Sequence, residues 1–363
     1  MACRDGSLTV GKTYYYHVQA CNSGGCSNYS SSASNTPISS DCTSTQMPNV
    51  ASVKISAPIS LVSNVVDPTV QFLPNSDEYA AYAASSVTRR NILVVELPGS
   101  GSTCGIGNFG RVAERLGFDV ICVNYSNAAE QIDICTGDIT CFGNISQAKL
   151  DATGPCSQPY SAGCGIDPTT KQPYVNSNPA DAVTQRVSMM LQYLNNNGYN
   201  QNGTNWSAYL SGTAPQWSSI IIGGFSQGGD MGTFAGYEQS VYRVYNLSGP
   251  PQATPVNGVM TGAAYFTQMS MTTNIRSVYG LVSVNDPNYQ DGDYYAVWQV
   301  LGFTAVNNDA EVKLNTATPI GLTCNSGTPS HNFSSSAMVS PDGGHADTLF
   351  LWNEDIFKFM LID

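Results

Sequence analysis

One short motif constrains this chain more than any other feature. Gly224-Phe225-Ser226-Gln227-Gly228 follows directly on the apolar run Ile220-Ile-Ile222. In this context the pattern G-x-S-x-G predicts a strand, a sharp turn and a helix, with the serine hydroxyl exposed at the turn. Side chains at the two outer positions would collide with neighbouring backbone, which is why glycine is needed there. We therefore predict Ser226 as a nucleophile.

A serine nucleophile needs a base, and the chain contains only three histidines. His17 lies in a predicted strand near the N-terminus, and His331 in a loop rich in Ser, Thr and Asn. His345 lies in Pro341-Asp-Gly-Gly-His345, beyond the last predicted strand. Because this architecture places its histidine after the nucleophile in chain order, we predict His345 as the base.

The acid that orients the histidine should follow a strand between Ser226 and His345. Asp286 ends the apolar run that begins at Tyr279, and it lies midway between them. The other aspartates of the region are weaker candidates, because they lie in the following loop or very near the histidine in sequence: Asp291, Asp293, Asp342 and Asp347. We predict that Asp286 holds the imidazole tautomer and stabilises the imidazolium.

An oxyanion hole requires two backbone N–H groups that face the developing charge. Gln227, at the start of the helix after the nucleophile, should supply one. The loop Pro98-Gly-Ser-Gly101 should supply the other, with Ser100 as the first choice and Gly101 as the second.

Strands and helices alternate along the chain from about residue 50, which predicts a mostly parallel sheet with helices on both faces. Asn178-Pro179-x-Asp181 predicts a helix start, with a cap residue, a proline in the first turn and an acid behind it. Further strands and one helix are expected at Ile92–Leu97, Val120–Tyr125, Ser219–Gly223, Arg243–Leu247, Ser277–Val284 and Glu311–Leu314, and from Phe109 to Leu116.

Residues 1–37 have a different character. Alternating Tyr14, Tyr16 and Val18 predict a half-buried strand, and a turn at residues 22–25 separates Cys21 from Cys26. This segment resembles the last third of a fibronectin type III domain, too short to close a sandwich alone. Residues 38–48 are predicted to be a linker, and residues 49–363 the main domain.

Eleven cysteines and few charges suit an oxidising, extracellular environment. Cys21 with Cys26, Cys135 with Cys141, and Cys156 with Cys164 are expected as local disulfides. Cys122 lies inside an apolar strand and is expected to be an unpaired, buried residue. No signal peptide is visible at Met1, so we expect a secreted protein whose upstream part is missing from this sequence.

Composition also argues against several partners. Only 11% of the residues are charged, and the net charge is −12, which disfavours nucleic acid as a partner. The absence of long apolar runs argues against a membrane span, and the cysteine spacings argue against a metal site. Gly105-Ile-Gly107-Asn-Phe-Gly110 fits the dinucleotide pattern, but no acid follows the next strand, so no cofactor is expected.

The motifs together resemble the α/β-hydrolase superfamily, and within it a group of secreted bacterial hydrolases. The segments that carry this resemblance are Leu97–Ser102, Asn124–Asn127, Cys135 with Cys141, Ala180–Arg186, Gly224–Gly229 and Asp342–His345. The resemblance implies an α/β-hydrolase fold and an esterase-like activity, without defining a substrate. The position of Phe225 is often histidine in that group.

The expected substrate is an ester, small or polymeric, such as a polyester or an acylated polysaccharide. Residues 126–178 are predicted to form a disulfide-tied cap or rim over the site, because long loops in compact domains are usually functional. Phe225, Tyr294 and Trp298 are candidates for substrate binding. Two other functions remain open: a peptidase or amidase with the same three residues, and a non-catalytic adhesion or binding protein.

Overall fold

The structure is a computed structural model of the whole chain. It describes residues 14–16, 21–22, 25–27, 33–35, 53–58, 77–127, 130–157, 164, 179, 182–283, 286, 288, 292–301, 312–314, 332–335, 348–349 and 354–362.

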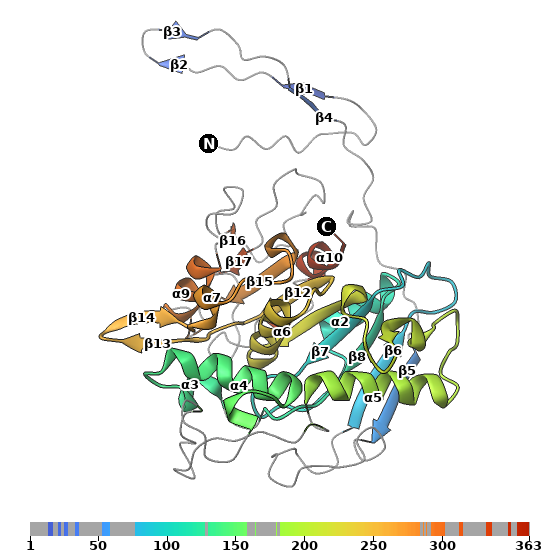
Figure 1. Ribbon diagram of the computed structural model, residues 1–363. Coiled ribbons are helices and arrows are strands. Elements are labelled where there is room, and N and C mark those ends of the chain that lie inside the picture. Colours follow the sequence, from blue (N-terminus) through green and yellow to red (C-terminus); the bar gives the residue numbers. More distant parts are fainter. Residues whose placement is uncertain are drawn as a thin grey trace.

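A nine-stranded sheet runs through the described part of the chain (Figure 1). Its spatial order is β16-β17-β15-β12-β11-β7-β8-β6-β5. The strands from β16 to β8 are parallel, whereas β6 is antiparallel to both β8 and β5. The strands are β5 (Val53–Pro58), β6 (Asp77–Tyr82), β7 (Leu93–Leu97), β8 (Asp119–Cys122), β11 (Ile220–Phe225), β12 (Arg243–Leu247), β15 (Val278–Ser283), β16 (Val312–Leu314) and β17 (Asn332–Ser335). The predicted, mostly parallel α/β sheet is confirmed.

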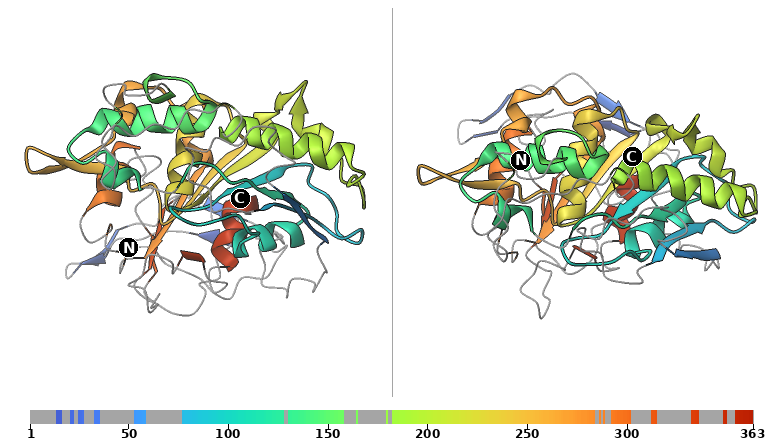
Figure 2. Two further views of the ribbon diagram at one scale, coloured as in Figure 1. Left: turned by 90° about the horizontal axis from the view of Figure 1, so that it is seen from below. Right: turned by 60° about the horizontal axis from the view of Figure 1, so that its bottom comes forward.

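Helices cover both faces of this sheet (Figure 2). On one face lie α2 (Asn108–Arg115) and α10 (Glu354–Ile362). On the other lie α4 (Ile139–Asp151), α5 (Val183–Asn196) and α6 (Gln227–Glu238). The central strand β7 contributes to both cores, because Val94 packs on the first face and Val95 on the second. A parallel strand that is buried on both faces needs an unbroken apolar run, as its sequence has.

One predicted helix boundary is wrong. We expected a helix from the Asn178-Pro179 cap, but α5 begins only at Val183. Ala182 has extended backbone angles, and its N–H donates to the Pro179 carbonyl in a separate short turn. The cap signal therefore belongs to a turn that precedes the helix.

The predicted insertion contains regular structure. It includes α3 (Gln131–Ile134), α4 and the short 3₁₀ turn η1 (Pro155–Ser157). Asp138 caps α4 by accepting hydrogen bonds from the Thr140 and Cys141 N–H groups. Disulfides join Cys135 to Cys141 and Cys156 to Cys164, as the local spacing predicts.

Two smaller features lie beside the sheet. A hairpin of β13 (Ala253–Val256) and β14 (Val259–Gly262) precedes α7 (Tyr265–Gln268). The helix α9 (Asp293–Val300) follows β15 and contacts the same hairpin. A second hairpin, β9 (Leu210–Ser211) with β10 (Ala214–Pro215), precedes β11.

The N-terminal segment shows short strands where a hairpin was expected. Strand β1 (Tyr14–Tyr16) pairs with β4 (Ala33–Asn35), and β2 (Cys21–Asn22) pairs with β3 (Gly25–Cys26). The register places Cys21 opposite Cys26, and Cys26 is disulfide-bonded. The fibronectin-like origin of this segment stays a prediction, and the linker at 38–48 lies outside the described residues.

Among the described helices, none combines the length and the apolar character that crossing a bilayer requires.

Candidate active site

Ser226 occupies the sharp turn between β11 and α6, as predicted. Its backbone lies at φ 53° and ψ −120°, a region that non-glycine residues rarely adopt. Its N–H donates to the Leu247 carbonyl of β12 at 2.8 Å, and its carbonyl accepts from the Gly229 N–H at 2.8 Å. The turn is thus held from both sides in a strained conformation, as is common at functional sites.

The two outer glycines of the motif are required by their neighbours. A Cβ at Gly224 would lie 2.9 Å from the carbonyl carbon of Leu97, and one at Gly228 would lie 2.8 Å from the same atom. In both cases the Leu97 oxygen would be nearer still. Gly224 and Gly228 therefore pack from two directions on the end of β7, and this close approach sets the shape of the turn.

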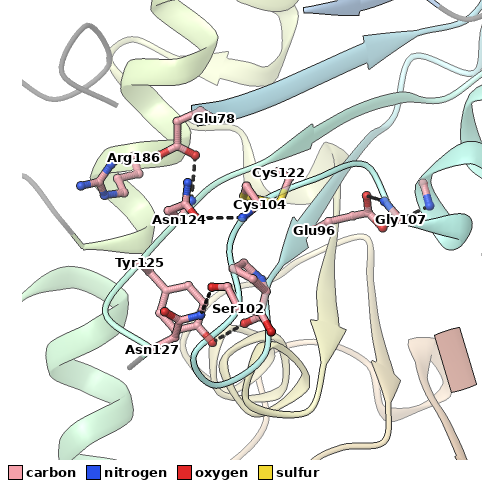
Figure 3. The surroundings of a disulfide bond; sticks show 12 residues. Glu78, Glu96, Ser102, Cys104, Gly107, Cys122, Asn124, Tyr125, Asn127 and Arg186 are labelled. Carbon is pink, nitrogen blue, oxygen red and sulfur yellow. Dashed lines mark hydrogen bonds and ion pairs between the residues drawn. A yellow bond between two sulfur atoms is a disulfide. The ribbon is translucent and has the colours of Figure 1, made fainter. Parts of the chain in front are cut away.

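The loop after β7 is fixed by the residues that follow β8 (Figure 3). The Asn127 side chain donates to the carbonyls of Gly99 at 2.5 Å and Ser102 at 2.8 Å. The Asn127 carbonyl accepts from the Gly101 N–H at 2.8 Å, and the Tyr125 hydroxyl donates to the Pro98 carbonyl at 2.9 Å. These hydrogen bonds hold the Pro98–Gly101 loop against the Asn124–Asn127 segment.

A disulfide completes this anchor and corrects one expectation. Cys122, expected to be unpaired, is bonded to Cys104 of the loop (Figure 3). The Cys104 N–H also donates to the Asn124 side chain at 2.9 Å. Because β8 lies beside β7, its end comes next to the loop that leaves β7, and this proximity is invisible in the sequence.

A buried ion pair supports the same region from the side of α5. The Arg186 guanidinium lies 2.9 Å from the Glu78 carboxylate, and both side chains are fully buried. Glu78 also accepts from the Asn124 N–H at 2.7 Å. Such pairs rarely add much stability, but removing one partner would leave an uncompensated charge.

Asp286 is described, whereas His345 lies outside the described residues. Asp286 follows β15, is fully buried, and accepts a hydrogen bond from the Asn288 N–H at 2.9 Å. Strands β11, β12 and β15 are adjacent and parallel, so Ser226 and Asp286 follow strands that end at the same edge of the sheet. Thr348, three residues after His345, is buried and hydrogen-bonded to Ser248 at the end of β12.

A small pocket that is open to solvent lies beside Ser226. Most of the residues that line it are polar, and they come from the β7 loop, the insertion, α6, the segment after β12 and the Asp286 loop. They are Ser100, Glu130, Gln131, Ile132, Phe142, Ser226, Gln227, Asp230, Pro251, Gln252 and Asn288. The insertion thus contributes directly to the wall of the site.

One chain of hydrogen bonds ties α4 to both sides of the turn. The Lys149 ammonium donates to Oε1 of Gln227 at 2.6 Å, and Nε2 of Gln227 donates to the Ser100 hydroxyl at 2.9 Å. An ammonium group has no acceptor, so Lys149 fixes which end of the Gln227 amide faces Ser100. Burial lowers the pKa of Lys149 to about 7, although the charge of Asp230 acts to raise it.

A second buried network of hydrogen bonds includes two residues of the pocket wall, Gln131 and Gln252. Gln252 donates to the Gln131 side-chain oxygen at 2.6 Å, and the Ser146 hydroxyl donates to the same oxygen at 3.4 Å. The Tyr265 hydroxyl donates to the oxygen of Gln252. Sequence reasoning missed this network and Lys149, because the partners are far apart in the chain. Asp230 could have been found, since it lies one helical turn after Ser226.

Two candidates for substrate binding, Phe225 and Trp298, are not among the described residues that line this pocket. Phe225 packs against the apolar cluster beneath α2 and α10. Trp298 is buried in the core, against Gly280 of β15. The Tyr294 side chain lies outside the described residues.

No metal site was predicted. The described residues include no group of three or more His, Cys, Asp or Glu that could hold an ion.

The strand order and the turn at Ser226 define an α/β-hydrolase fold. Searches with the sequence match no protein family and no curated protein. Solved structures with partial similarity include a protein assigned as a dienelactone hydrolase from Klebsiella pneumoniae subsp. pneumoniae, at 11% identity. The match covers 86% of this chain and 100% of that one, with a TM-score of 0.37.

Two further structures are similar at the same level. One is a feruloyl esterase module from Clostridium thermocellum in complex with sinapinate, at 11% identity over 87% of this chain and 90% of that one, with a TM-score of 0.35. The other is an S-formylglutathione hydrolase from Agrobacterium tumefaciens, at 12% identity over 85% and 94%, with a TM-score of 0.32.

Proposed function

We propose that this protein is a secreted serine hydrolase that cleaves carboxylic esters, with Ser226 as nucleophile, His345 as base and Asp286 as acid. The observation that carries the proposal is the strained turn at Ser226, pressed by two glycines onto the end of β7. A structural turn needs neither a serine at positive φ nor such a close approach. A nucleophilic serine whose hydroxyl is exposed beyond the end of the sheet needs the strained backbone and the close packing of the glycines.

Described residues near Asp286 and His345 in the sequence support the same proposal. Asn288 lines the pocket together with Ser226, so the loop that carries Asp286 reaches the site. Thr348 is anchored to Ser248 by a hydrogen bond at 2.9 Å. His345 precedes Thr348 by three residues in the sequence, so we propose that it acts at this edge of the sheet.

For the oxyanion hole, the geometry favours Ser100 over Gly101. The Gly101 N–H already donates to the Asn127 carbonyl. Ser100 lines the pocket, and its side chain is hydrogen-bonded to Gln227, the other predicted donor. The side chains of the two residues that would supply these N–H groups are thereby hydrogen-bonded to each other.

In the proposed reaction, His345 removes the proton of the Ser226 hydroxyl as its oxygen attacks the ester carbonyl. The tetrahedral oxyanion is held by the Ser100 and Gln227 N–H groups. It collapses to an acyl-enzyme while His345 returns the proton to the leaving alcohol. Water, activated by His345, then releases the acid and restores Ser226.

An ester is favoured over an amide because an alkoxide leaves with little protonation, whereas an amine must be protonated as it departs. The glycine-rich sequences beside Ser226 and before His345 suit an open site. The disulfides at 104–122, 135–141 and 156–164 support an oxidising environment. A polyester or an acylated polysaccharide is the polymeric substrate that we consider first.

The test compares the wild type with Ser226→Ala, and uses Ser207→Ala, an exposed serine away from the pocket, as the matched control. We expect Ser226→Ala to lose on the order of 10⁴-fold in kcat on p-nitrophenyl acetate and to lose fluorophosphonate labelling, while remaining folded. Ser207→Ala should keep both. A folded Ser226→Ala variant that stays active would exclude this nucleophile.

Substrate class is tested on the wild type with p-nitrophenyl esters beside peptide p-nitroanilides. We expect turnover of the esters and little or none of the anilides. Equal or better kcat/KM on the anilides would show a peptidase, and no turnover or labelling of Ser226 would show a non-catalytic protein.

A further inference from the structure

Asp230 is a buried carboxyl group in the wall of the pocket. It lies one turn after Ser226 in α6, and its N–H donates to the Ser226 carbonyl at 3.2 Å. The residue is 3% exposed, yet it lines the same pocket as the nucleophile. The residue therefore borders the pocket in which a substrate would bind.

One oxygen of this carboxyl lacks a partner. Oδ1 of Asp230 is buried and accepts no hydrogen bond from the residues that the structure describes. Buried polar atoms in native proteins are almost always satisfied, and an exception at a functional site calls for a specific explanation. A hydrogen-bond donor on a bound substrate would satisfy it.

None of the neighbouring described side chains donates a hydrogen bond to Oδ1 of Asp230. Lys149 attracts Asp230 electrostatically, but its ammonium donates to Gln227. Gln131 and Gln252, the nearby amides of the pocket wall, are hydrogen-bonded to each other. The wall thus contains hydrogen-bonded amides beside an Asp230 oxygen that has no partner among the described residues.

The charged groups around Asp230 favour an uncharged hydrogen-bond donor as its partner. Burial raises the pKa of Asp230 well above its ordinary value, against the attraction of Lys149, and the Glu130 carboxylate raises it further. A carboxyl group can accept a hydrogen bond from a hydroxyl group in either protonation state. An ammonium group would have to be desolvated beside the buried Lys149.

We propose that Asp230 is a specificity-determining residue that binds a hydroxyl group of the substrate next to the scissile ester. This inference rests on the proposed esterase function. The substrate class is then an ester of a hydroxy acid, or of a polyol or sugar, rather than a plain fatty acyl ester. A site built to bond a hydroxyl rejects the analogue that lacks it, because its own polar group is left unpaired.

The first experiment uses the wild-type chain and esters that differ in one group. On the acyl side these are p-nitrophenyl butyrate, 3-hydroxybutyrate (both enantiomers) and 3-aminobutyrate. On the alcohol side they are propyl butyrate and 2,3-dihydroxypropyl butyrate. We expect kcat/KM to favour a hydroxylated ester on at least one side by about 10- to 100-fold.

The second experiment measures the same ratios in variants of Asp230. Asp230→Leu should bring the preference close to one, and Asp230→Ala should do the same if the leucine variant does not fold. Asp230→Asn, which keeps an acceptor oxygen, should retain part of the preference. Glu238→Gln, a carboxyl of the same helix outside the pocket, is the control and should leave the ratio unchanged.

The outcomes separate this inference from the function on which it rests. Turnover of plain and hydroxylated esters at equal kcat/KM would keep the esterase and overturn the role of Asp230. A preference that survives in Asp230→Leu or Asp230→Ala would also overturn it, as would a preference for the aminobutyrate. No turnover of any ester would overturn the proposed function itself.

Discussion

Replacing Gly228 by alanine tests the packing that shapes the turn at Ser226. A Cβ at this position would lie 2.8 Å from the Leu97 carbonyl carbon and 3.2 Å from the Pro98 oxygen, with the Leu97 oxygen closest. These are backbone atoms, and Leu97 is paired with Gly224 of β11, so they cannot turn away as a side chain could. Either β7 or the start of α6 must shift.

Two effects oppose each other in this variant. Alanine in place of glycine inside a helix stabilises by about 0.5–1 kcal/mol when the space is free. Overpacking against a fixed backbone costs about 1–3 kcal/mol, and the higher end applies where the neighbours cannot move. We therefore expect a net loss of about 2 kcal/mol. A shift near 1 Å at the turn would also lower kcat by on the order of 100-fold.

The assay is equilibrium urea unfolding, followed by tryptophan fluorescence with the disulfides intact, together with kcat on p-nitrophenyl acetate. Gly105→Ala is the matched control, because a Cβ there would meet no atom within 4 Å. That variant should unfold within about 0.5 kcal/mol of the wild type. A Gly228→Ala protein with wild-type stability and kcat would refute the packing argument.

Three further predictions concern the surroundings of the site. Lys149→Met should lower kcat on p-nitrophenyl acetate by about 10-fold with little change in KM, because the Gln227 amide loses the donor that orients it; an unchanged kcat would remove Lys149 from the site. Burial raises the pKa of Glu96 to about 7, so the stability linked to this group is present below about pH 4.5 and lost as the pH rises through 7, by about 3 kcal/mol. Urea titrations between pH 4 and 8 should show this decline in the wild type and a flatter profile in Glu96→Gln; equal slopes would contradict it. The double variant Cys104→Ala, Cys122→Ala should lose about 3 kcal/mol in the same titration, since the bond closes a loop of 18 residues. Stability equal to that of the wild type under non-reducing conditions would exclude this bond.

The sequence predicted the fold because the alternation of strands and helices is a local pattern. The limits of β12 agree with the expectation residue by residue, and those of β7, β11 and β15 agree within two residues. The start of α5 was missed because a cap signal can serve a short turn as well as a helix. Only the backbone angles of Ala182 distinguish the two.

The candidate site was predictable in part for the same reason. The glycines around Ser226 and an aspartate at the end of β15 are features of a few adjacent residues, and so are the disulfides at 135–141 and 156–164. His345 and Asp286 stay predictions as catalytic residues. Phe225 was expected at the pocket because of its position in the motif. Its side chain packs against the apolar cluster beneath α2 and α10.

By itself, then, the sequence determined what depends on near neighbours: the type of each element, the strained turn and the short disulfide loops. The tertiary structure decided which distant groups meet. Cys122 finds Cys104 because β8 lies beside β7, and Lys149 reaches Gln227 across 78 residues of chain. The Asp230 oxygen, which has no hydrogen-bond partner among the described residues, is likewise buried only in the folded chain, where α4 packs against α6. Such contacts depend on packing between elements, and a local pattern carries no record of them.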